Sequence, residues 1–118
     1  MKYVDGYVIP VPKKNLAAYR RMSAAAGKVW REYGALEFCE CVGDDLKVAK
    51  VRSFPSMVKP KPGEAIVFSW IVYESKAHRD RVNDEVMQDP RLIKMMKSKM
   101  PFDPKRMSYG GFRMMVDA

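Results

Sequence analysis

The stretch Ala65-Ile-Val-Phe-Ser-Trp-Ile-Val-Tyr-Glu74 decides the fold of this chain. Most of its residues are β-branched, aromatic or otherwise apolar, which is typical of a β-strand. Alternate residues of a strand point to opposite faces, and here both sets are largely apolar. The stretch is therefore predicted to be a central strand that is covered on both sides.

Two strands and a helix are predicted before this strand. Residues 3–11 and 35–42 have strand composition, and between them apolar residues recur at helical spacing. Asn15 is expected to cap this helix and Gly34 to end it. Its opposite face carries Lys14, Arg20, Arg21, Lys28 and Arg31, as a solvated face does. Residues 47–62 are expected to form a loop, in which Val48 and Val51 could belong to a short strand.

Two helices and a strand are predicted after the central strand. Ser75 is expected to cap a helix that runs to about Met87, and Asp89-Pro90 opens a shorter one. Residues 107–116 form the last strand. The order is that of a ferredoxin-like β-α-β-β-α-β plan with an extra short helix, in one α+β domain over residues 1–118.

The bare face of such a sheet predicts a homodimer. Helices on one side of the sheet leave the other side exposed, and neither face of the central strand is polar enough for water. A second copy of the sheet is the simplest cover. The alternative is a monomer in which residues 47–62 cover that face.

Several segments resemble the YbaA-like family of uncharacterised bacterial proteins, within the dimeric α+β barrel superfamily. These segments are Tyr3-Val-Asp-Gly6, Ser53-Phe-Pro55, Val67-Phe-Ser-Trp-Ile-Val-Tyr73, Met100-Pro-Phe-Asp103 and Arg106-Met-Ser-Tyr-Gly-Gly-Phe112. The resemblance implies a dimeric α+β barrel and no particular activity. The wider superfamily includes cofactor-free monooxygenases, small isomerases, haem-degrading enzymes and sensors without catalytic activity.

The net charge of +8 raises nucleic acid as an alternative partner. Basic residues cluster in segments 47–61 and 91–106. Each cluster could equally be a solvated surface that keeps the protein in solution. Phe54 and Phe102 are the only aromatic residues there, whereas single-strand binders stack bases on several.

Neither a secretory signal nor a membrane span is expected, so a cytoplasmic location is predicted. No cofactor or metal is predicted either. Cys39 and Cys41 are expected to be buried free thiols, because His78 is the only histidine that could complete a metal site. His78 itself is expected to lie at the surface or to pack against neighbours.

Asp5 is the candidate catalytic residue. It lies between Tyr3 and Tyr7 on one face of the first strand, where burial would raise its pKa and suit it to act as a base. The alternative is a carboxylate near the strand end, solvated or paired with an arginine.

Five further residues share this face by strand parity and are candidates for ligand binding, with Arg113 as the anchor for an anion: Tyr7, Ser69, Tyr73, Tyr109 and Arg113. This holds if Gly110-Gly111 introduces no bulge. Alternatively, the tyrosines form interface core with their hydroxyls at its rim.

Three functions follow from these features. The leading one is a small-molecule-binding dimer or cofactor-independent enzyme, with its pocket between sheet and helices. The others are nucleic-acid binding through the two basic segments and a structural or regulatory dimer without a ligand, which predicts an interior filled by side chains.

Overall fold

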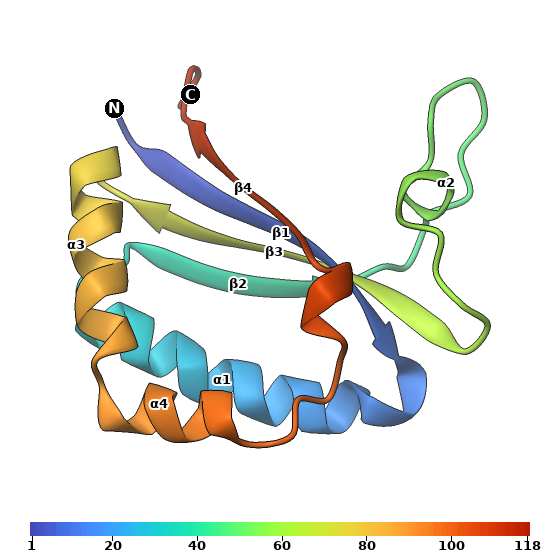
Figure 1. Cartoon of the computed structure of the whole chain (residues 1–118). Coiled ribbons are helices and arrows are strands. Elements are labelled where there is room, and N and C mark those ends of the chain that lie inside the picture. Colours follow the sequence, from blue (N-terminus) through green and yellow to red (C-terminus); the bar gives the residue numbers. More distant parts are fainter.

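Four strands form one antiparallel sheet in the computed structural model, which describes residues 1–118 (Figure 1). The strand order is β2-β3-β1-β4. The strands are β1 (Tyr3–Pro12), β2 (Glu37–Val42), β3 (Glu64–Tyr73) and β4 (Ser108–Arg113). The helices are α1 (Leu16–Glu32), α2 (Phe54–Val58), α3 (Lys76–Met87) and α4 (Pro90–Lys97), with 3₁₀ turns at Lys13–Asn15 and Pro104–Arg106. This arrangement confirms the predicted ferredoxin-like plan and the central place of β3.

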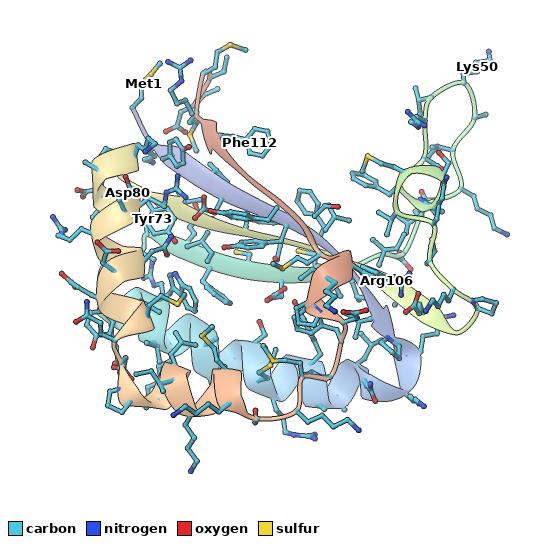
Figure 2. The ribbon with its side chains drawn as sticks, in the orientation of Figure 1. Met1, Lys50, Tyr73, Asp80, Arg106 and Phe112 are labelled. Atoms are coloured by element: carbon cyan, nitrogen blue, oxygen red, sulfur yellow. The ribbon has the colours of Figure 1, made fainter.

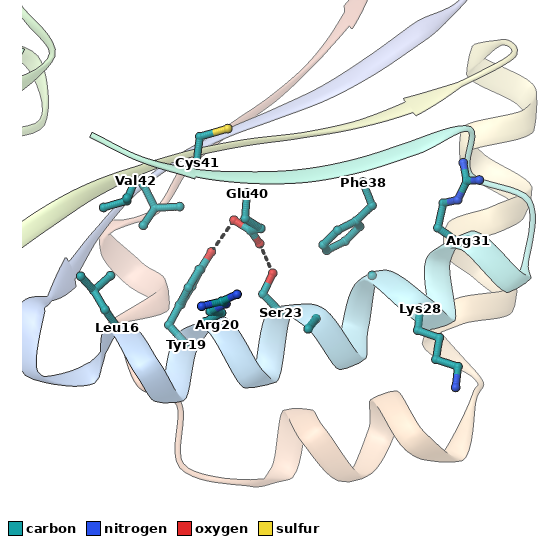
Figure 3. A pocket seen from close by; sticks show the side chains of 13 residues that line it. Leu16, Tyr19, Arg20, Ser23, Lys28, Arg31, Phe38, Glu40, Cys41 and Val42 are labelled. Atoms are coloured by element: carbon teal, nitrogen blue, oxygen red, sulfur yellow. Dashed lines mark hydrogen bonds between the residues drawn. The ribbon is translucent and has the colours of Figure 1, made fainter. Parts of the chain in front are cut away.

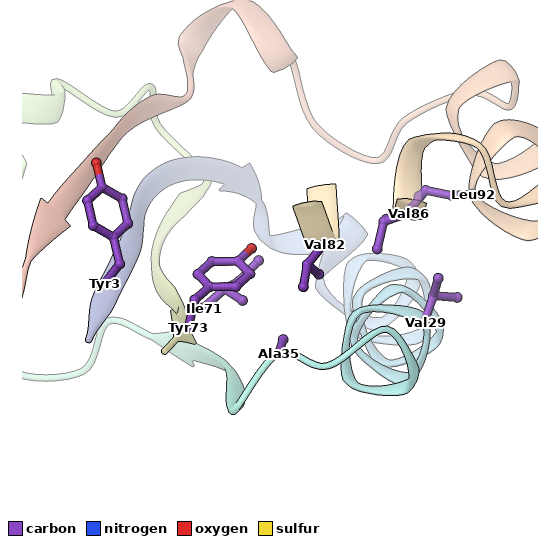
Figure 4. Packing of buried hydrophobic residues seen from close by; sticks show 8 residues of the cluster. All are labelled: Tyr3, Val29, Ala35, Ile71, Tyr73, Val82, Val86 and Leu92. Atoms are coloured by element: carbon purple, nitrogen blue, oxygen red, sulfur yellow. The ribbon is translucent and has the colours of Figure 1, made fainter. Parts of the chain in front are cut away.

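The helices α1, α3 and α4 cover one face of the sheet, which we call the inner face (Figure 1). The main core lies between them and the central strands, as Figure 4 shows. It contains Tyr3, Val29, Ala35, Ile71, Tyr73, Val82, Val86 and Leu92. A second buried cluster lies nearer the start of α1 and contains Ile9, Val11, Tyr19 and Val67.

The predicted capping residues begin and end the helices in the structure. The Ser75 side chain accepts a hydrogen bond from the His78 N–H at 3.0 Å, and Asp89 accepts one from the Arg91 N–H at 2.8 Å. Gly34 has a φ of +116°, which suits a glycine after a helix. Asn15 precedes α1 as predicted, but its side chain caps nothing. Its amide donates to the Pro101 carbonyl at 3.0 Å and so ties the start of α1 to the segment after α4.

The connection between β2 and β3 differs from the prediction. Val48 and Val51 lie in no strand and are exposed, since the chain leaves the sheet after β2 and no strand pairs with this segment. Residues 47–62 form a loop as predicted except for the short helix α2, which Ser53 caps by accepting from the Ser56 N–H at 3.2 Å. Five residues are too few for a helical repeat to show in the sequence.

The other face of the sheet, the outer face, is apolar and largely uncovered. Trp70 is half-buried there, while Phe68 is 44% exposed and Phe112 63% exposed. Figure 2 shows Phe112 on β4, projecting away from the helices. The connection contacts part of this face: the Phe54 ring of α2 meets the Phe68 ring, with centroids 6.1 Å apart, and α2 also contacts β1, while Phe112 stays exposed. The connection therefore leaves much of the outer face exposed, whereas the monomeric alternative requires the connection to cover it.

Cys39 and Cys41 lie on edge strand β2, with register partners Trp70 and Phe68 on the outer face. Both thiols are free, as predicted, but Cys39 is only half-buried and Cys41 is exposed. In the single chain the prediction of burial is wrong, because β2 is an edge strand with a neighbour on one side only. None of the helices is both long and apolar enough to span a membrane.

Candidate functional site

Asp5 lies on the inner face of β1 and is completely buried, with an exposed fraction of 0%. Its Oδ1 accepts a hydrogen bond from the Tyr109 hydroxyl at 3.1 Å and lies 3.4 Å from Nη1 of Arg79. Its Oδ2 has no hydrogen-bond partner. Of the alternatives for Asp5, pairing with an arginine is what the structure shows, inside the protein and not at a solvated strand end.

Arg79, from α3, is the cation of this cluster. Its Nη1 donates to the Tyr109 hydroxyl at 2.7 Å, and its guanidinium carbon lies 4.9 Å from the centre of the Tyr3 ring. Only 15% of its side chain is exposed. Our sequence prediction missed Arg79. The sequence does hold a signal for it: Arg79 and Asn83 lie on the same side of the helix as Val82 and Val86, which are buried.

Burial raises the pKa of the Asp5 carboxyl above its ordinary value, against the opposing effects of Arg79 and the Tyr109 hydroxyl. Burial and the negative charge of Asp5 raise the pKa of Tyr109 as well. Tyr109 therefore stays a neutral donor, while the proton of Asp5 is held more tightly than that of a solvated aspartate. A carboxyl of this kind is suited to acid–base chemistry.

The other candidate residues on the inner face are Tyr7, Ser69 and Tyr73, on the strands beside Asp5 and Tyr109. The Tyr7 ring stacks on the Tyr109 ring with centroids 4.9 Å apart. Ser69 and Tyr73 are buried on β3, and the Tyr73 hydroxyl donates to Oδ1 of Asn83 at 3.2 Å. That oxygen also accepts from the Trp30 indole at 3.1 Å. Contact of these residues with a ligand stays a prediction.

Arg113 shares the inner face but stands apart from Asp5. The pairing of β1 with β4 continues through Gly110 and Gly111 without a bulge, so Arg113 lies opposite Tyr3. Its side chain is exposed and forms no hydrogen bond or ion pair, because β4 is an edge strand that ends there. The cation at Asp5 is Arg79 instead. Close packing explains Gly111, since a Cβ there would lie 2.5 Å from the Tyr3 hydroxyl oxygen.

His78 packs inside the fold, one of the two positions expected for it. It is buried, and its Nδ1 accepts a hydrogen bond from the Glu74 N–H at 3.0 Å. Its ring meets the Tyr73 ring edge to face, with centroids 5.9 Å apart. No three of the chain's His, Cys, Asp and Glu side chains gather where they could hold a metal ion.

A second candidate site lies between α1 and β2, as a pocket of about 600 Å³ (Figure 3). The Tyr19 hydroxyl donates to Oε1 of Glu40 at 2.8 Å, and the Ser23 hydroxyl donates to Oε2. The sequence predicts a pocket between sheet and helices, but none of the predicted site residues lines this one. Arg20, Lys28 and Arg31 are exposed, as predicted for a solvated face, and also border the pocket. The signal in the sequence is a group of small residues on α1, Ser23, Ala24 and Gly27, all of which line the pocket.

One row of polar residues crosses the inner face between the two sites. Glu40 on β2 is the register partner of Ser69 on β3, Ser69 of Tyr7 on β1, and Tyr7 of Tyr109 on β4. With neighbouring strands about 4.8 Å apart, β2 and β4 are separated by roughly 14 Å across the sheet. The Glu40 pocket and the Asp5 cluster therefore lie at opposite edges of one face.

Solved structures of very different sequence share this fold over nearly their whole length. Rv0793 from Mycobacterium tuberculosis is 12% identical with a TM-score of 0.61, and the match covers 100% of this chain and 99% of that one. A mutant of SnoaB, a cofactor-independent oxygenase from Streptomyces nogalater, is 10% identical with a TM-score of 0.56, covering 98% and 95%. A dimeric ferredoxin-like protein from an uncultured marine organism is 9% identical with a TM-score of 0.55, covering 99% and 98%. The fold thus defines the class: a ferredoxin-like α+β protein that matches dimeric α+β barrel proteins.

The family is defined by sequence. Residues 2–104 match the model of the family described as "Protein of unknown function (DUF1428)", and the chain belongs to this family. It is 48% identical to the uncharacterized protein YbaA of Escherichia coli K12 over 117 residues, 99% of each chain, and equally similar to YbaA of Shigella flexneri. The predicted resemblance is confirmed.

Proposed function

We propose that the protein is a homodimer that binds a small organic molecule beside Tyr109 and exchanges a proton with it through Asp5, without a cofactor. The observation that carries this proposal is the completely buried carboxylate of Asp5, which has one oxygen without a partner and an arginine beside the other. Burying a charge is costly, and a group without a catalytic or binding task would more readily be apolar.

Tyr109 connects Asp5 to the surface. Its hydroxyl bonds to both Asp5 and Arg79, whereas 50% of the residue is exposed. A ligand next to Tyr109 could receive a proton from the tyrosine hydroxyl while the tyrosine regains one from Asp5. Arg79 would stabilise negative charge that develops on the ligand.

The outer face supports the homodimer. Its exposed aromatic residues Phe68 and Phe112 form part of an apolar surface around a pocket of about 560 Å³. Apolar patches of this kind mark interaction sites. One protein of the same fold is described as dimeric, and SnoaB is described as a cofactor-independent oxygenase. These likenesses concern the fold alone.

The two alternative functions have less support. The arginines of the basic segment 91–106 are paired, Arg91 with Asp89 and Arg106 with Glu64. The Phe102 ring packs against Tyr19, so it is not free to stack on a base. A ligand-free dimer predicts an interior filled by side chains, whereas the space between α1 and β2 is a pocket.

The test is deuterium exchange into a panel of ketones, keto acids and phenols, followed by proton NMR in D₂O. We expect the wild type to exchange at least one class of carbon-bound proton above the buffer rate, and Asp5→Asn to lose about a hundredfold or more of that rate. Asp45→Asn, an exposed carboxylate in the connection, is the matched control. Exchange that Asp5→Asn leaves intact, or no exchange across the panel, would contradict the proton-transfer role.

A further inference from the structure

The pocket between α1 and β2 exists because the facing side of the helix carries small side chains. Gly27 lies one helical turn beyond the small residues Ser23 and Ala24, and all three line the pocket. A Cβ on Gly27 would lie 2.6 Å from Cδ1 of Phe38, so the Phe38 ring rests directly against the helix backbone. The pocket extends from Phe38 to Leu16 alongside the hydrogen-bonded side chains of Tyr19, Ser23 and Glu40 (Figure 3).

The walls are apolar and the polar group inside them is already satisfied. Leu16, Val42 and Val67 line the pocket together with the Phe38 ring. Glu40 has a hydroxyl donor on each of its carboxylate oxygens, from Tyr19 and from Ser23. The carboxylate thus needs no cation from a ligand.

Positive charge at the pocket has no acidic partner. Arg20 is exposed and forms no ion pair or hydrogen bond, and Arg31 donates only to the carbonyl oxygens of Ala35 and Leu36. Lys28 is different, because its ammonium group points away from the pocket (Figure 3). Two guanidinium groups therefore border an apolar space that holds one carboxylate.

We infer that this pocket binds an amphipathic organic anion, a carboxylate with an aromatic or short aliphatic body. The carboxylate would pair with Arg20, since guanidinium groups bind carboxylates with two parallel hydrogen bonds. The body would lie along Leu16, Phe38 and Val67. The volume of about 600 Å³ suits such a ligand. This site shares no residue with the Asp5 cluster and goes beyond the proposed function.

The probes are naphthoate and octanoate, with naphthamide and octanamide as neutral analogues of the same shape. Binding is followed by amide chemical shifts of the isotope-labelled full chain. We expect saturable shifts on α1 and β2 for both carboxylates, with the amides at least about tenfold weaker because they lose the charged pair. Equal affinity for acid and amide, shifts centred on Asp5, or no saturable binding would overturn the inference.

Arg20→Met and Lys28→Met form the matched pair of variants, because both remove an exposed cation from the same helix. Arg20→Met should weaken naphthoate binding about tenfold or more, whereas Lys28→Met should stay within about twofold. Equal losses would mean general charge attraction and would overturn the site. Asp5→Asn should leave this affinity unchanged, so that failure of the pocket and failure of the proton-transfer role are distinguished.

A second copy of the chain is the competing occupant, since β2 is an edge strand. Sedimentation velocity on the same samples tests it. We expect the oligomeric state to be the same with and without naphthoate and in Arg20→Met. Dissociation by the carboxylate or by that variant would place a second copy in the pocket and overturn the inference.

Discussion

Asp5 is held between two opposing effects, burial that disfavours its charged form and Arg79 that favours it. Burial is the larger, so the pKa of Asp5 is raised above the ordinary 3.8. The native state then keeps a proton that the unfolded chain has already lost. Stability linked to Asp5 is therefore present at low pH and lost as the pH rises through the raised pKa.

This direction of the pH dependence gives a prediction for Asp5→Asn, whose amide cannot titrate. As the pH rises from about 4 towards 7, the free energy of unfolding of the wild type should fall relative to that of the variant, by at most about 1.4 kcal/mol per pH unit. Urea denaturation of both proteins across this range measures the difference. A wild type that gains stability relative to Asp5→Asn as the pH rises would mean that the Arg79 pair dominates.

Asn83 is a half-buried residue whose side chain joins α1 to β3, and its loss should be costly. Its Oδ1 accepts from both the Trp30 indole and the Tyr73 hydroxyl. Asn83→Ala leaves the half-buried Trp30 indole and the buried Tyr73 hydroxyl without this partner, so we expect a loss of about 2–4 kcal/mol in the free energy of unfolding. Adding Tyr73→Phe should cost less in the Asn83→Ala background than in the wild type. Strict additivity, measured by urea denaturation, would exclude the coupling.

At the scale of elements, the contact between α1 and β2 depends on Gly27. An alanine is ordinarily better than glycine inside a helix by about 1 kcal/mol. Here the added Cβ would meet the Phe38 ring at 2.6 Å. We expect Gly27→Ala to destabilise the fold by about 1–3 kcal/mol.

The control for Gly27→Ala is the same substitution without the Phe38 ring, where the change in stability should have the opposite sign. In a Phe38→Ala background the ring is absent, and Gly27→Ala should then stabilise the protein by up to about 1 kcal/mol. Thermal or urea denaturation of the four proteins of this cycle measures both effects. A Gly27→Ala that is stabilising in the wild type would show that the helix and strand adjust freely at this contact.

The elements themselves were predictable wherever a repeat or a cap marked them. The apolar run 65–74 placed β3, and Ser75, Asp89 and Gly34 marked helix ends. Residue parity also placed Tyr7, Ser69, Tyr73 and Tyr109 on the face of Asp5, because no bulge interrupts β4. Parity places a side chain on a face but does not say what lies above it.

Contacts between distant elements were not predictable for that reason. Helical spacing places Arg79 on the inward side of α3, but it does not say that the Arg79 side chain reaches Asp5 on β1 and Tyr109 on β4. The pocket at Glu40 depends likewise on how closely α1 approaches β2. The helix α2 was missed because it is too short for periodicity and its Phe54 packs on a distant strand.

At the scale of the whole molecule, both proposed sites lie on the inner face, and the proposed dimer interface is the apolar outer face. The molecule measures 20 Å along its shortest axis, which corresponds to one sheet and one layer of helices. Pairing two outer faces would bury the exposed Phe68 and Phe112 and leave both inner sites in place.

Adjacent residues of β4 test this arrangement. Phe112 lies on the outer face and Arg113 on the inner face, and both are exposed. We expect Phe112→Glu to convert a dimer to a monomer, because it would bury an unpaired charge at the interface. Arg113→Glu should remain dimeric. Sedimentation velocity at micromolar concentration compares them, and a dimer that survives Phe112→Glu would place the interface elsewhere.

The most direct test of the central claim is a titration of Asp5 itself. Carbon-13 NMR of the side-chain carboxyl, assigned by comparison with Asp5→Asn, follows its protonation in the intact protein. The structure predicts a midpoint above the ordinary pKa of 3.8, since burial outweighs the pairing with Arg79. A midpoint at or below 3.8 would make Asp5 a permanently charged partner of Arg79 and would contradict its role in proton transfer.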